Sequence, residues 1–185
     1  AQTEIRASGA GSGTFDATQF NAEQTRIGAT VEAVQTYDFA GYTLQGTGFG
    51  QFGKAPAYMM SIWANNSGQG GVTKNTDVAA GMYDANIQAM LNQAAADHAA
   101  GYKIPVFRIG WEISANANWF TWQPDGLGGP ASGTGNNAAN YVAAFRHIAA
   151  MVRTTCPWAL IDFCADWSFM ADANFYPGDD VVDII

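Results

Sequence analysis

Short apolar runs alternate with helical stretches along this chain, and that rhythm constrains the fold more than any other feature. The run at 57–63 has a continuous apolar character, as in a strand buried on both faces, and the runs at 104–112 and 159–167 are mainly apolar. Between them, the pattern at 84–101 begins at a candidate N-cap, Asp84, and ends at a glycine. Strands and helices in regular alternation predict βα units that share a parallel sheet.

The whole chain can be divided in the same way. We expect strands at 3–10, 29–39, 57–63, 104–112, 159–167 and 181–185. We expect helices at 17–26, 84–101 and 137–153. The last helix carries Tyr141, Phe145, Ile148 and Val152 at spacings of four, three and four, which form one apolar face.

Size and charge limit the class of protein. The 185 residues suffice for a single domain, expected to cover 1–185, and 48% apolar residues allow a sizeable core. The net charge is -8 and the eight basic residues are scattered, which excludes a nucleic-acid binder. No run of 18 apolar residues occurs, so no membrane span is expected.

Composition also predicts where the protein works. Charged residues make up only 13% of the chain, and the start "AQTEIRASGAG" is typical of what remains after cleavage at a small-residue site. We therefore predict a secreted or periplasmic protein. In that setting Cys156 and Cys164 favour a disulfide, with two buried thiols as the alternative.

No metal or cofactor is expected. The cysteine spacing fits no zinc pattern, and His98 and His147 lie elsewhere, inside helical patterns. Both histidines are interpreted as helix-surface or packed side chains.

Glu112 is the candidate for chemistry. It ends the apolar run in "FRIGWEISANANWFTW", residues 107–122, and period-two alternation puts Arg108, Gly110 and Glu112 on one face. If that face is a barrel interior, partial desolvation raises the pKa of Glu112, as a general acid requires. The alternative is an Arg108–Glu112 salt bridge with no catalytic role.

Aromatic and amide side chains surround this acid. Flat rings stack on the C–H faces of sugars, and amides select hydroxyls. The expected sugar contacts are Trp63, Trp111, Trp119, Trp122, Trp167, Asn116, Asn118, Tyr37 and Asp38, with Arg108 positioning Glu112. For any single tryptophan, ordinary core packing is the alternative. The glycine-rich loops at 65–76 and 123–137 lack phosphate-binding patterns and are interpreted as cleft or surface loops.

These motifs resemble those of one enzyme family. "FRIGWE" followed by "NWFTW" is similar to the acid/base segment of family 26 glycoside hydrolases. In the same order, "GMYDANIQAMLNQAA", "NYVAAFRHIAAMVR" and "FYPGDDVVDII" resemble the preceding helix, the following helix and the segment leading into the sixth strand. The resemblance covers about residues 81–185.

The resemblance implies an α/β fold of the (β/α)8 TIM-barrel type, with about six βα units in this chain. It also implies a retaining hydrolase that acts on β-linked polysaccharide, commonly β-mannan, with Glu112 as acid/base. Such an enzyme needs a second carboxylate about 5–5.5 Å away as nucleophile, which the family carries at the end of the seventh strand.

The sequence departs from the family in two places. Ser114 stands where the family often has asparagine, so Asn116 or Asn118 is expected to substitute. The sequence also ends at Ile185, within the expected sixth strand. Three explanations stay open: a longer protein, a second chain that completes the barrel, or a different second carboxylate.

For the last case the candidates are Asp38 and, preferred, Asp166, whose alternative role is hydrogen bonding in the cleft. The function expected is thus hydrolysis of a β-glycan. The alternative is a non-catalytic carbohydrate-binding protein or a subunit of a larger assembly.

Overall fold

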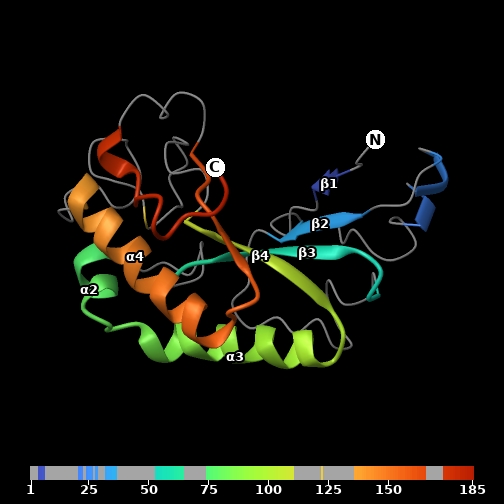
Figure 1. The fold of residues 1–185 in the computed structure, drawn as a ribbon, viewed down its shortest axis with the longest axis horizontal. Helices are drawn as coiled ribbons and strands as arrows, with labels where there is room; N and C mark the ends of the chain where they lie inside the picture. The colour runs from blue at the N-terminus through green and yellow to red at the C-terminus, as the bar shows by residue number, and fades with distance from the viewer. Residues whose placement is uncertain are drawn as a thin grey trace.

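Five parallel strands form one sheet (Figure 1). The structure is a computed structural model that describes residues 4–6, 21–22, 24–26, 28, 32–36, 53–64, 74–110, 122, 136–165 and 173–185. The strands are β1 Glu4–Arg6, β2 Ala33–Thr36, β3 Ala57–Ile62, β4 Lys103–Ile109 and β5 Leu160–Asp162. They are neighbours in the order in which the chain makes them.

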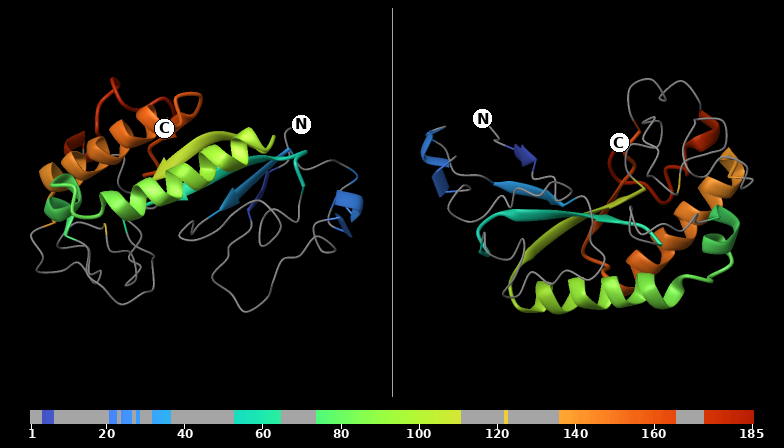
Figure 2. Two further views of the ribbon diagram at one scale, coloured as in Figure 1. Left: turned by 90° about the horizontal axis from the view of Figure 1, so that it is seen from below. Right: turned by 180° about the vertical axis from the view of Figure 1, so that it is seen from behind.

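This strand order distinguishes a barrel from a doubly wound sheet. Right-handed crossovers that always step to the next strand put every helix on the same face, whereas a doubly wound sheet reverses direction at a switch point. The helices α3 Asp84–Ala99 and α4 Ala138–Thr155 do lie along one face (Figures 1 and 2). The arrangement is that of part of a (β/α)8 barrel, as the sequence predicts.

Several predicted boundaries are too long. β4 ends at Ile109, three residues before the predicted end. In place of a sixth strand, the described residues contain a single parallel bridge between Asp162 and Ile184. An apolar run marks burial, but it continues past the last ladder hydrogen bond, so strand ends cannot be read from it.

Two short helices were not predicted. They are α2 Asn75–Ala79, which begins inside the expected loop 65–76, and the 3-10 turn η2 Ala173–Phe175. Helices of one turn are unstable alone and exist through tertiary contacts, so they leave little periodic signal. In the predicted helix 17–26, residues 21–22 and 24–26 are helical.

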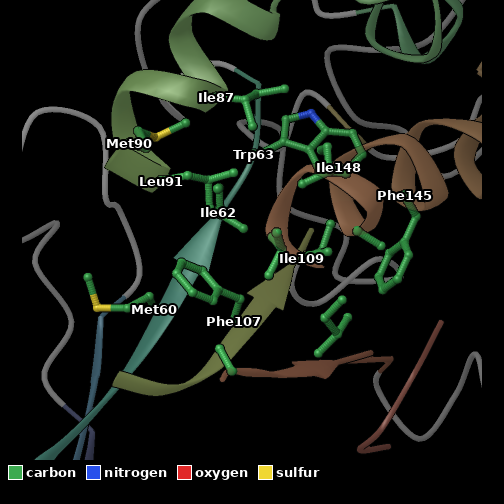
Figure 3. Packing of buried hydrophobic residues seen from close by; sticks show 14 of the residues in the cluster. Met60, Ile62, Trp63, Ile87, Met90, Leu91, Phe107, Ile109, Phe145 and Ile148 are labelled. Carbon is green, nitrogen blue, oxygen red and sulfur yellow. The ribbon is translucent and has the colours of Figure 1, made fainter. Parts of the chain in front are cut away.

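The core lies between the sheet and the helices. Met60 pairs in register with Phe107, and Ile62 pairs with Ile109, so these four side chains share one face. Figure 3 shows Ile62 and Ile109 close to side chains of α3 and α4, among them Leu91 and Ile148, and all four strand residues belong to the same buried cluster. Each such buried side chain contributes about 1.5–3 kcal/mol relative to exposure.

The predicted apolar face of α4 is confirmed, because Tyr141, Phe145, Ile148 and Val152 are all buried. The caps of the helices are partly different from those expected. Asn137 caps α4, its side chain accepting from the Asn140 N–H at 2.9 Å.

At the start of α3, the N-cap is Tyr83 rather than Asp84. The Asp84 carboxylate instead lies 2.6 Å from His147 Nε2 and joins the two helices. His98 stacks on Trp158 at 4.0 Å. Both histidines therefore have the packed or surface roles expected.

The predicted disulfide is wrong. Both cysteines are free thiols. Cys156 is buried before β5, with its Sγ 3.7 Å from the Leu91 carbonyl oxygen, while Cys164 follows the other end of that strand. An intervening strand holds the two side chains too far apart to bridge. Burial raises the pKa of Cys156 to about 11, which makes the thiol unreactive.

Two arginines of α4 hold the C-terminal segment. Arg146 binds Asp180 through both Nη atoms, at 2.8 and 2.5 Å. Arg153 Nη2 lies 2.5 Å from Asp183, whose carboxylate also accepts from the Ile161 N–H at 2.7 Å. The aspartates of "GDDVVD" are thus bound by protein donors.

The described residues contain neither a membrane-spanning helix nor a metal-binding cluster. No helix in those ranges is long and apolar enough to cross a membrane. Nor do the same residues contain a group of three acidic, histidine or cysteine side chains that could hold a metal ion.

The contacts of Asp183 predict that acid weakens the attachment of the C-terminal segment to α4. Burial acts to raise the pKa of Asp183, but the Ile161 N–H and Arg153 outweigh it and hold that pKa below its usual range. The stabilisation is therefore complete above the unfolded pKa of about 3.9 and is lost as pH falls through the folded value.

Thermal unfolding between about pH 6 and pH 2 should therefore show a steeper acid loss for the wild type than for Asp183→Asn. The variant should be less stable at pH 6 by about 1 kcal/mol. Parallel stability curves for the two proteins would contradict this role of Asp183.

Candidate active site

Three polar residues form a row on the sheet face opposite the helices. Ser61 pairs with Arg108 across β3 and β4, and Arg108 pairs with Asp162 across β4 and β5. Residues paired in a parallel ladder project to the same side, and these alternate with the helix-facing Ile62 and Phe107. In a barrel this side is the interior.

An ion pair joins two members of this row. Arg108 Nε donates to Asp162 Oδ2, and the side chains are 17% and 3% exposed. The sequence suggested Glu112 as the partner of Arg108 and did not single out Asp162. The signal was present, since Asp162 is the one charged residue inside the apolar run "ALIDFC".

Ser61 completes the row and was also not predicted. Its hydroxyl is buried and has no hydrogen-bond partner among the described residues. A buried unpaired hydroxyl costs about 1–3 kcal/mol, so the interior at this level is polar at the expense of stability.

Gly110 marks the point where the predicted alternation ends. Its φ of +56° turns the chain out of the extended conformation. A Cβ there would lie 3.0 Å from Trp63 Cζ3, on the core side and not on the Arg108 side. The expectation that Gly110 continues the Arg108 face is therefore wrong, and with it the alternation argument for Glu112.

Two of the tryptophans that were expected to contact sugar belong to the core. Trp63 and Trp122 are 3% and 0% exposed, with ring centroids 5.6 Å apart. Trp63 also stacks on Tyr141 at 6.0 Å and 11°. Neither ring has a free face, so the burial does not support a sugar-binding role for these two.

Burial also raises the pKa of Tyr141, whose hydroxyl lies 3.5 Å from the Gly110 carbonyl oxygen.

The remaining predicted site residues lie outside the described residues. They are Tyr37, Asp38, Trp111, Glu112, Asn116, Asn118, Trp119, Asp166 and Trp167. In the sequence, Tyr37 directly follows β2, Glu112 follows Gly110, and Asp166 follows Ala165 after β5. These segments leave the carboxyl ends of parallel strands, the edge where barrel enzymes carry their catalytic groups.

The chain is similar to known proteins in its structure, but the comparisons of its sequence find no match. No protein-family model matches the sequence. No curated protein matches it either.

Several solved structures are similar, among them these two. One is a β-mannanase from a symbiotic protist of the termite Reticulitermes speratus, complexed with gluco-manno-oligosaccharide, with 16% identity and a TM-score of 0.65. The other is the family 26 glycoside hydrolase domain of an endo-β-mannanase/endo-β-glucanase from Prevotella bryantii, with 14% identity and a TM-score of 0.59.

Both similarities cover 98% of this chain but only 62% and 65% of the other chains. This chain has the (β/α)8-barrel type of fold. At this level of identity the likeness establishes architecture, and the resemblance read from the sequence holds for the fold.

Substitution of Gly110 tests the close approach to Trp63. Gly110→Ala should destabilise the protein by about 1–3 kcal/mol, because the new methyl group meets both a positive φ and the indole ring. The matched control is Gly28→Ala, where φ is +66° but nothing lies within 4 Å. Urea unfolding should show a smaller loss for the control, and equal losses would contradict the contact.

A double-mutant cycle tests the interior ion pair. Removing either Arg108 or Asp162 alone should cost about 3–5 kcal/mol, because the partner charge stays buried, and the double variant should cost less than the sum. The exposed pair Arg146–Asp180, with side chains 42% and 65% exposed, serves as the comparison. Its coupling should be the weaker of the two, because solvent screens exposed charges. Additive losses at Arg108 and Asp162 would contradict the buried pair.

Proposed function

We propose that this protein is a glycoside hydrolase that cleaves β-linked polysaccharide, β-mannan or a related β-glycan, with retention of configuration. The observation that carries the proposal is the structural match along 98% of the chain to two β-mannanases. One of these holds a gluco-manno-oligosaccharide. The motifs around Glu112 support the same family from the sequence alone.

In this proposal Glu112 is the acid/base. It gives its proton to the leaving glycosidic oxygen while a second carboxylate attacks the anomeric carbon. It then takes a proton from the water that releases the sugar from that carboxylate.

The Arg108–Asp162 pair suits this role. An uncompensated arginine would favour the charged form of a neighbouring acid, whereas a proton donor must start protonated. Asp162 balances the charge of Arg108, and in this proposal the arginine also orients Glu112.

The second carboxylate comes from outside the described residues. Asp162 is held by Arg108 and is 3% exposed, so a sugar cannot reach it. Asp166 is the candidate within this chain. A glutamate on a later strand, supplied by a further segment or a second chain, is the candidate that the family resemblance implies, and this chain spans less than two thirds of the two similar structures.

Sugar binding is assigned to the exposed-loop candidates. These are Trp111, Trp119, Trp167, Asn116, Asn118, Tyr37 and Asp38. Polysaccharides are too large to enter cells, so an enzyme acting on them works outside the cytoplasm. The proposed location is therefore secreted or periplasmic.

A non-catalytic carbohydrate-binding protein is the second candidate. The observation in its favour is that the described part of the interior face has no second carboxylate free to act as nucleophile. Such a protein would keep the cleft and lose turnover.

One variant separates the two. Glu112→Gln should lower kcat on β-mannan or glucomannan by about 10²–10⁴-fold, because the amide can neither give nor take the proton, while oligosaccharide binding measured by calorimetry persists. Glu32→Gln, at an exposed glutamate before β2, is the matched control and should keep full activity. Binding without reducing-end release by the wild type would instead establish the carbohydrate-binding reading.

A further inference from the structure

The segment that carries Glu112 starts against Trp63. Gly110, two residues before Glu112, donates its N–H to the Ile62 carbonyl at 3.2 Å. Its backbone lies so close to Trp63 that a Cβ would stand 3.0 and 3.1 Å from two indole carbons. The chain therefore leaves β4 at a position set by this ring.

The same segment returns to the same ring. Trp122 is fully buried, and its ring centroid lies 5.6 Å from that of Trp63 at an interplanar angle of 54°. Trp63 thus contacts the chain on both sides of residues 111–121. Tyr141 of α4 supports it from a further side, stacked at 11°.

Asn75, the first residue of α2, holds this return point. Its Nδ2 donates to the Trp122 carbonyl at 3.1 Å, and its backbone N–H donates to Asn136 Oδ1 at 2.7 Å. Asn75 and Asn136 are 0% and 1% exposed. Loss of one buried hydrogen bond of this kind lowers the free energy of unfolding by about 1–3 kcal/mol.

We propose that Asn75 is a positioning residue for the acid/base, acting through Trp122. Its side chain keeps Trp122 on Trp63 and so fixes the span of chain between Gly110 and Trp122 at both ends. Asn75 is the first residue of α2 and lies outside both this segment and the loop that follows it. The inference rests on the proposed function, in which Glu112 transfers the proton.

The test is a pair of variants of similar side-chain size: Asn75→Asp, whose carboxylate when ionised cannot donate to the Trp122 carbonyl, and Asn75→Leu, which has no donor in any protonation state. Asn86→Asp, on the exposed side of α3, is the matched control. Each variant is compared with the wild-type protein as the full chain, at a temperature well below the unfolding temperature of either.

Leaving-group dependence separates positioning from general damage. A misplaced acid slows cleavage of a natural sugar leaving group, which needs a proton, but not of a dinitrophenyl leaving group, which does not. We expect both Asn75 variants to lower kcat/KM on mannooligosaccharide by about 10–100-fold and on the dinitrophenyl β-mannooligosaccharide by less than about threefold. Equal losses on both substrates, or no loss, would overturn the proposal.

A physical readout keeps the test independent of activity. Hydrogen exchange by mass spectrometry should be faster in both Asn75 variants at peptides spanning 110–122, and unchanged there in Asn86→Asp. An inactive wild type with this exchange pattern would remove the proposed function but leave the attachment standing. Unchanged exchange at 110–122 in both Asn75 variants would overturn the attachment itself.

Discussion

The packing of Gly110 against Trp63 is the contact on which the candidate site depends. It lies at the carboxyl end of β4 and sets the position at which the chain leaves that strand. Trp63 is itself the residue that follows β3, so one strand end determines how its neighbour leaves the sheet. A side chain larger than hydrogen at 110 would have to displace either the indole or the backbone.

The two faces of the sheet are built from opposite chemistry. Met60, Ile62, Phe107 and Ile109 pack on the helices and supply the hydrophobic stabilisation. On the other face, the row of Ser61, Arg108 and Asp162 carries a buried charge pair and a buried hydroxyl with no partner in the described part of the chain. Such groups stabilise little and are typical of sites that bind or react.

Arginine pairs, and not a disulfide, hold the last described segment to α4. Arg146 and Arg153 lie on α4 at i and i+7 and bind Asp180 and Asp183. Asp183 also accepts a backbone hydrogen bond from β5. The prediction of a disulfide considered only composition and spacing, and could not include the strand that separates the two thiols.

The sequence by itself determined the class of fold, because alternating βα periodicity and the apolar face of α4 are local patterns that burial then follows. It also pointed to Arg108 on an interior face and to the family resemblance. Only the tertiary structure decided that Trp63 and Trp122 are core, that Asp162 is the partner of Arg108, and that Asn75 reaches Trp122. Each of these is a contact between residues distant in the chain, and periodicity along one segment contains no information on which distant residue faces it.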